Sequence, residues 1–165
     1  VLDFACRVTC DFAAAQEEAG ADFVVLLEPT AALLSPELYE RFVGPYVRRV
    51  VERVDIPLVL HVCGQTTKLI PSFVKDPVQG LSLDTDVDLA AIAPGVPEDV
   101  AIIGNVSPVD EMLNGTPRSI RDAVAKLGAA MASYPNFVPS TGCDVPPDAP
   151  KENLEAFTAA VRELE

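Results

Sequence analysis

Five short apolar runs, each followed by residues with helical spacing, limit what this chain can fold into. The run from Phe23 to Leu27 is continuously apolar, which is typical of a strand buried on both faces, and Pro29 follows it closely. Strands that alternate with helices pair in parallel through right-handed crossovers. The sequence therefore predicts strands over 23–28, 56–62, 80–84, 100–105 and 136–140, and helices over 3–19, 36–54, 67–74, 87–93, 117–132 and 150–164. The first helix is expected to bury one apolar stripe: Phe4, Val8, Phe12 and Ala15.

The chemically reactive residues fall at the ends of these predicted strands. No Gly-x-Gly-x-x-Gly motif follows any strand, which disfavours a dinucleotide-binding fold. In a (β/α) barrel the carboxyl ends of the strands meet on one face, where catalytic groups lie. We therefore predict an α/β fold, a TIM-like (β/α) barrel represented by its C-terminal five strand–helix units of eight. The residues at these strand ends are Glu28, His61, Cys63, Asp84, Asn105 and Cys143.

Composition and charge exclude several classes of function. Apolar residues make up 49% of the 165 residues and charged residues 22%, which fits one soluble globular domain. The net charge of −13 disfavours binding to nucleic acid or to an anionic membrane, and no apolar run approaches the ~20 residues of a membrane span. The chain lacks an initiator Met and a signal peptide, so we expect a fragment of a cytoplasmic protein with reduced cysteines.

One histidine and two cysteines form a candidate metal site. His61 and Cys63 are two residues apart and face the same side of a strand, and Cys143 follows 80 residues later (143 − 63). A His-Cys-Cys set leaves the fourth position of a tetrahedral zinc open for substrate, and zinc would deprotonate a bound thiol. A lone histidine is more often a core residue, and the cysteines could be inert buried thiols. Spacing alone leaves both interpretations open.

Several motifs resemble a known family. His61-Val62-Cys63-Gly64 followed by a distant Gly142-Cys143 resembles the His-x-Cys…Cys zinc pattern of methylcobamide:coenzyme M methyltransferases, which belong to the uroporphyrinogen decarboxylase superfamily. The resemblance covers the whole chain and implies a single domain, 1–165, that corresponds to strands four to eight of the family barrel and lacks the first three. Further matching segments are 19–22, 83–84, 104–108, 142–147 and 150–153.

The resemblance implies that His61, Cys63 and Cys143 bind zinc. The family reaction moves a methyl group from a corrinoid (a methylcobamide carried by a partner protein) to a zinc-bound thiol such as coenzyme M. Uroporphyrinogen decarboxylase itself lacks this triad. Glu28 is expected to occupy the fourth zinc position or to receive the thiol proton, or else to be a solvent-exposed or Arg-paired residue. Asp84 and Asp86 are expected to order the rim of the site, to hydrogen-bond His61 or to cap turns, and Asp84 is also expected to bind substrate. Asn105 is expected to contact substrate or to stabilise a turn.

Two other functions remain open from the sequence. An incomplete barrel exposes strand edges and apolar surface, which favours a non-catalytic module that binds a corrinoid protein or a sister subunit. Homo-oligomer formation or completion by a missing N-terminal half is expected for the same reason. The third reading is a metal-free decarboxylase relative that acts on a tetrapyrrole. Such a site needs basic side chains for the substrate carboxylates, and few of the 12 Lys and Arg residues fall near strand ends.

Overall fold

A five-stranded parallel sheet forms the centre of the molecule. The computed structural model describes residues 1–164, and the strands pair in their sequence order, β1-β2-β3-β4-β5. Each strand begins and ends within two residues of its predicted position, so the predicted strands are confirmed. Their bounds are β1 Val24–Glu28, β2 Leu58–Val62, β3 Gly80–Leu83, β4 Ala101–Val106 and β5 Phe137–Thr141.

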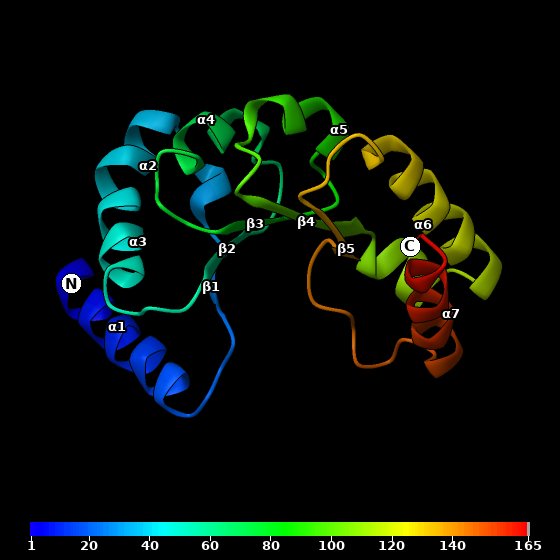
Figure 1. The fold of residues 1–165 in the computed structure, drawn as a ribbon, viewed down its shortest axis with the longest axis horizontal. Coiled ribbons are helices and arrows are strands. Elements are labelled where there is room, and N and C mark those ends of the chain that lie inside the picture. Colours follow the sequence, from blue (N-terminus) through cyan, green and yellow to red (C-terminus); the bar gives the residue numbers. More distant parts are fainter. Residues whose placement is uncertain (165) are drawn as a thin grey trace.

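The helices follow one side of this sheet in an arc and leave the opposite, inner side open (Figure 1). Strand–helix alternation and an incomplete barrel are therefore both present. The α-helices are α1 Leu2–Glu18, α2 Pro36–Phe42, α3 Gly44–Val51, α4 Ile70–Phe73, α5 Leu89–Ile92, α6 Pro117–Met131 and α7 Lys151–Arg162. Short 3-10 turns lie at η1 Ala31–Leu33, η2 Thr67–Leu69 and η3 Ala93–Gly95, and a π-helical segment, η4, covers Pro108–Leu113.

The single helix predicted over 36–54 is wrong, because the chain forms two helices there. Its start is as expected: Ser35 caps α2 by accepting a hydrogen bond from the Leu38 amide, and Pro36 occupies the first turn. The break falls at Val43, whose φ and ψ are −119° and −56°. Pro45 lies in the first turn of α3 and has no N–H to donate to the preceding turn, so the helix restarts there.

The π-helical segment η4 was not predicted, although its start carries the same signal as α2. Ser107 accepts a hydrogen bond from the Asp110 amide at 3.0 Å, and Pro108 follows it directly. Asn153 of α7 then donates to the carbonyl oxygens of Met112 and Gly115 at 3.0 and 3.1 Å. These two bonds join the end of η4 to the closing helix.

The core lies between the sheet and its helices. Leu58, Leu60 and Val62 on β2 are fully buried. Leu81 and Leu83 on β3, which pair with Leu60 and Val62, are fully buried as well. The expectation that β1 is buried on both faces is wrong, since Val25 is 43% and Leu27 63% exposed. Both residues line the same cavity as His61 and Ser82, on the inner side of the sheet. Among the described residues, the helices follow the other side (Figure 1).

The apolar stripe predicted for α1 is also exposed. Phe4, Val8 and Phe12 are between 53% and 65% exposed, whereas the helix buries Cys6, Ala13 and Ala14. Small side chains let α1 lie close to its neighbours: the Cys6 Sγ lies 3.8 Å from a backbone oxygen of α3. The Cys6 and Cys10 sulfur atoms lie 3.9 Å apart; Cys6 is buried in the core, and the partly buried Cys10 packs against it.

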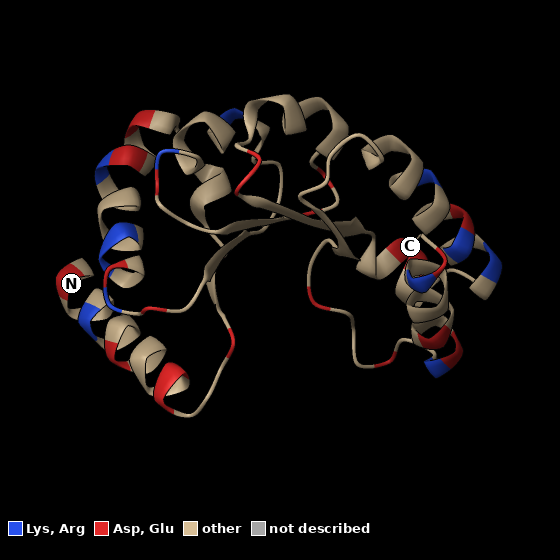
Figure 2. Cartoon of the chain, in the orientation of Figure 1, with Lys and Arg blue, Asp and Glu red and all other residues tan. Residues whose placement is uncertain are grey.

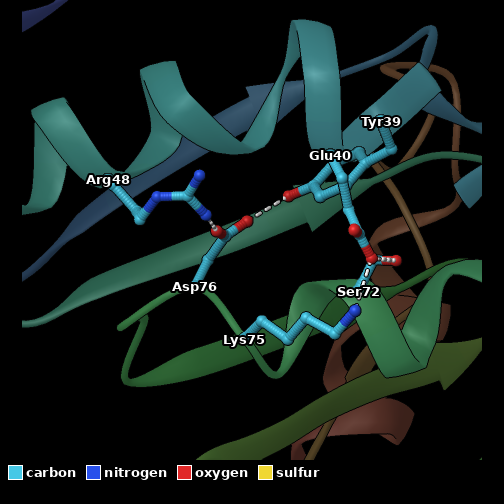
Figure 3. Close-up of polar contacts among 6 residues, drawn as sticks. All are labelled: Tyr39, Glu40, Arg48, Ser72, Lys75 and Asp76. Carbon is cyan, nitrogen blue, oxygen red and sulfur yellow. Dashed lines mark hydrogen bonds and ion pairs between the residues drawn. The ribbon is translucent and has the colours of Figure 1, made fainter. Parts of the chain in front are cut away.

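A buried polar cluster joins α2 and α3 to the loop that precedes β3 (Figure 3). The Tyr39 hydroxyl, which is fully buried, donates to Asp76 Oδ2 at 2.7 Å, and the Arg48 guanidinium donates to the other oxygen of that carboxylate. Tyr39 also packs edge-on against Phe73, with 4.9 Å between ring centroids. Glu40 accepts from Ser72 at 2.8 Å and pairs with Lys75.

Most of the Lys, Arg, Asp and Glu residues belong to helices and loops (Figure 2). Among residues 1–164, no Lys or Arg lies on a strand. Within the same range, none of the helices combines the length and the apolar character that crossing a bilayer requires.

Candidate metal centre

His61, Cys63 and Cys143 meet at the carboxyl ends of β2 and β5. The His61 Nε2 lies 3.5 Å from the Cys63 Sγ and 3.6 Å from the Cys143 Sγ, and the two sulfur atoms are 3.8 Å apart. His61 is buried, at 8% exposure, and the two cysteines are half-buried. Their role as metal ligands stays a prediction that the geometry makes testable.

Strand register explains why these side chains share one face. His61 lies opposite Leu27 of β1 and Ser82 of β3 in the parallel sheet, so all three side chains point to the inner side. Cys63 follows two residues after His61 and keeps that direction, and Gly64 turns the chain away with a positive φ of 76°. On the other side, the Thr141 hydroxyl donates to the Cys143 carbonyl at 2.9 Å and holds the turn after β5.

The three donor atoms fit a tetrahedral zinc ion. Zn–S bonds of about 2.3 Å and Zn–N bonds of about 2.0 to 2.1 Å place two sulfur ligands about 3.8 Å apart, and nitrogen about 3.6 Å from sulfur. The observed separations are 3.8 Å for the sulfur pair and 3.5 and 3.6 Å for the nitrogen–sulfur pairs. A cavity of about 160 Å³ lies beside His61 and Cys143. The donor set therefore has room beside it for a further ligand.

The charges around the sulfur atoms favour a bound cation. Burial, the neighbouring Cys143 and then Asp84 and Asp144 together raise the pKa of the Cys63 thiol to about 11. Without a cation this thiol keeps its proton at neutral pH. A divalent ion would offset both the desolvation and the repulsion that hold the proton in place.

Ser82 was not identified from the sequence, yet it contacts the histidine directly. Its Oγ lies 2.9 Å from the His61 Nδ1. When Nδ1–H donates to this hydroxyl, the lone pair on Nε2 faces the two sulfur atoms, as metal binding requires. The contact could have been predicted from the alternation of side chains along β3, which places Ser82 next to His61 on the same face of the sheet. The sequence had instead suggested Asp84 or Asp86 for this contact.

Asp84 and Asn105 are engaged with the backbone. The Asp84 carboxylate accepts from the amides of Gly64 and Thr85, both at 2.6 Å. Asn105 donates to the carbonyl oxygens of Asp84 at 3.0 Å and Val87 at 2.6 Å. Stabilisation of a turn was one of the roles expected for each residue, and these contacts agree with it. A contact of either with substrate stays a prediction.

Glu28 lies apart from the triad. It pairs in register with Val62, whose side chain is buried on the helix side of the sheet, whereas His61 points to the inner side. The Glu28 carboxylate accepts from the Thr30 amide at 2.9 Å and from the Thr30 hydroxyl at 2.7 Å. Strand alternation thus separates Glu28 from the donor atoms. Its described hydrogen bonds go to Thr30, so no contact in this structure supports the expected role of Glu28 as fourth ligand.

The fold and this site define a class of protein: part of a (β/α) barrel with a His-Cys-Cys cluster at the carboxyl ends of its strands. The family model for uroporphyrinogen decarboxylase (URO-D) matches residues 1–164, and the chain belongs to that family.

Curated relatives include both methyltransferases and decarboxylases. The chain is 34% identical over 170 residues to the methylcobamide:CoM methyltransferase MtbA of Methanosarcina acetivorans, covering 98% of this chain and 48% of that protein. It is 30% identical to the methylcobamide:CoM methyltransferase MtaA of Methanosarcina barkeri, covering 96% of the chain and 47% of the relative. A uroporphyrinogen decarboxylase of Prochlorococcus marinus is 31% identical, with 97% and 46% covered. The chain thus spans about half the length of the curated relatives it matches.

Solved structures support the partial barrel. A methyltransferase from Methanosarcina mazei superposes with a TM-score of 0.86 at 25% identity, covering 98% of this chain and 48% of that one. A B12-independent methionine synthase from Shewanella superposes with a TM-score of 0.71 at 17% identity, covering 96% and 53%, which shows likeness of fold alone.

Proposed function

We propose that this chain contributes the zinc centre of a methyltransferase that moves a methyl group from a methylated corrinoid, carried by a partner protein, to a small thiol such as coenzyme M. The observation that carries this proposal is the set of separations among the His61, Cys63 and Cys143 donor atoms, which match a tetrahedral zinc site. The names of the relatives MtbA and MtaA agree with the reaction.

The donor set favours this reaction over decarboxylation. Sequence identity to the relatives does not distinguish methyl transfer from decarboxylation, because a decarboxylase relative is 31% identical. A cluster of two thiols and an imidazole suits a soft metal ion, whereas a tetrapyrrole with several carboxylates needs basic groups. Among the described residues, none of those lining the cavity beside the triad is Lys or Arg.

Each residue of the centre has a distinct task in the proposed reaction. When bound, zinc would lower the pKa of the acceptor thiol so that it reacts as a thiolate. His61, Cys63 and Cys143 would hold the ion, and the Ser82 hydroxyl orients the imidazole. Val25 and Leu27 line the same cavity and place apolar side chains beside the donor atoms. The S–C bond forms as the Co–C bond breaks, with the electron pair of that bond remaining on cobalt.

Zinc content tests the proposal. We expect about one zinc per chain in tag-free wild-type protein and a large loss in Cys143→Ser, measured by elemental analysis after dialysis. Cys10→Ser is the matched control, because Cys10 is a thiol on α1 outside the triad. Glu28→Gln should also keep its zinc, since Glu28 contacts Thr30 rather than the donor atoms.

Two outcomes contradict the proposal. Absence of zinc from the wild-type protein would favour the metal-free decarboxylase reading. Unchanged zinc in Cys143→Ser would remove Cys143 from the ligand set. A non-catalytic half-barrel is the remaining alternative, favoured by the exposure of Val25 and Leu27, and it predicts zinc binding without methyl transfer from methylcobalamin to a thiol in the full-length protein.

A further inference from the structure

The turn that follows β3 lies between the two cysteine-bearing loops. This turn, residues 84–87 and called here the Asp84 turn, is closed by a hydrogen bond from the Val87 amide to the Asp84 carbonyl at 3.0 Å. The Asp84 carboxylate joins it to the Cys63 loop by accepting from the Gly64 amide at 2.6 Å. A second hydrogen bond joins the Cys63 loop to the turn: the side-chain amide of Gln65 donates to the Asp86 carbonyl at 2.6 Å.

The other side of the turn meets the Cys143 loop at Gly142. A Cβ on this buried glycine would lie 2.5 Å from the Thr85 Oγ1 and 2.6 Å from the Thr85 backbone nitrogen. Only the absence of a side chain allows so close an approach. The Gly142 amide also donates to the Val106 carbonyl of β4 at 2.8 Å, which fixes the start of the loop.

Asn105 of β4 holds the two ends of the turn. Its side-chain amide, on β4, donates to both ends of the turn, at Asp84 and at Val87. The turn is therefore held on three sides: by β4 through Asn105, by the Cys63 loop through Asp84, and by the Cys143 loop through Gly142.

We propose that the Asp84 turn is the spacer that sets the distance between the Cys63 and Cys143 sulfur atoms, and that Asp84 and Gly142 are positioning residues of the metal centre. This inference rests on the proposed function, because the spacing matters only if the sulfur atoms bind a metal. Metal–ligand distances tolerate deviations of only about ±0.2 Å. Ordinary van der Waals contact begins at 3.4 Å, so a methyl group at position 142 would displace one loop by about 1 Å.

Cobalt(II) is the probe, because its visible and near-ultraviolet absorption reports how many sulfur atoms bind and with what geometry. The full-length protein is stripped of metal and titrated with cobalt under reducing conditions. Gly142→Ala and Asp84→Asn are each expected to bind cobalt about 10- to 100-fold more weakly than wild type, with a smaller sulfur-to-cobalt charge-transfer band per bound ion. A purely structural role would lower thermal stability without changing the spectrum of the bound ion.

Two matched controls separate spacing from other effects. Gly95→Ala adds the same methyl group where no atom lies within 4 Å. Asp86→Asn removes the same charge from the same turn, but the described hydrogen bond of Asp86 uses its backbone carbonyl. Both controls should match wild type. Asp84→Asn keeps the size of the side chain and decides the question if Gly142→Ala does not fold.

The possible failures are distinguishable. If wild type binds no cobalt through sulfur, the proposed zinc centre is wrong. If wild type binds cobalt through sulfur and both Gly142→Ala and Asp84→Asn match it in affinity and spectrum, the turn is not the spacer.

Discussion

His61 is the single histidine of the chain, so the nitrogen that it turns toward the sulfur atoms decides whether a metal can bind. We predict that Ser82→Ala weakens zinc binding about 10- to 100-fold, because the ring loses the hydroxyl that accepts from Nδ1. Chelator competition measures this, and Ser82→Thr should restore most of the affinity. Ser140→Ala is the control, since Ser140 lines the same cavity without a described bond to His61. Equal affinity in Ser82→Ala and the control would contradict the assignment.

The raised pKa of Cys63 sets the pH dependence of metal binding at this same residue scale. Zinc binds the thiolate, and burial raises the pKa of this thiol to about 11, so binding at neutral pH must displace its proton. Affinity therefore rises with pH by about tenfold per unit for that proton, or about 100-fold from pH 6 to pH 8. Chelator competition across this range checks the slope. Cys10→Ser should leave the slope unchanged, and a flat profile in wild type would show that Cys63 is not a ligand.

At the scale of elements, capping signals predicted where helices begin better than where they end. Ser35-Pro36 identified the start of α2, and the equivalent pair Ser107-Pro108 would have identified η4. The break between α2 and α3 could have been predicted from Pro45, whose ring removes a backbone donor. Apolar spacing was misleading for α1, because it places Phe4 and Phe12 on one face without indicating whether that face is covered.

The cluster around Asp76 is the main polar link among α2, α3 and the loop before β3 (Figure 3). We predict that Tyr39→Phe lowers the free energy of unfolding by about 1 to 3 kcal/mol, because the buried Asp76 carboxylate loses a hydrogen-bond donor. Urea denaturation followed by circular dichroism measures the change. Tyr46→Phe is the matched control, since Tyr46 is only partly buried and its hydroxyl has no described partner. A loss for Tyr39→Phe no larger than for Tyr46→Phe would show that the cluster adds little stability.

At the scale of the whole molecule, the inner side of the sheet is the surface that this chain leaves uncovered (Figure 1). Leu27 on β1 is 63% exposed and Val138 on β5 is 45% exposed, and each belongs to a strand at an open edge of the sheet. We predict that the 165-residue chain self-associates with increasing concentration, as measured by sedimentation velocity. The double variant Leu27→Ser with Val138→Ser should weaken association. Leu33→Ser, which removes an 85% exposed leucine from η1, should not.

The alternation of strands and helices, and the residues at the strand ends, could be predicted from the sequence because periodicity, prolines and caps act over a few neighbouring residues. The sequence also identified His61, Cys63 and Cys143 as a candidate metal set. Three features required the folded structure: Ser82 rather than Asp84 contacts His61, Glu28 lies on the opposite face from the triad, and the Asp84 turn separates the cysteine loops. The reason is that the Gly64–Asp84 and His61–Ser82 contacts join residues 20 and 21 positions apart, and His61 and Cys143 are 82 apart. Strand register and loop packing, which local patterns do not encode, bring these residues together.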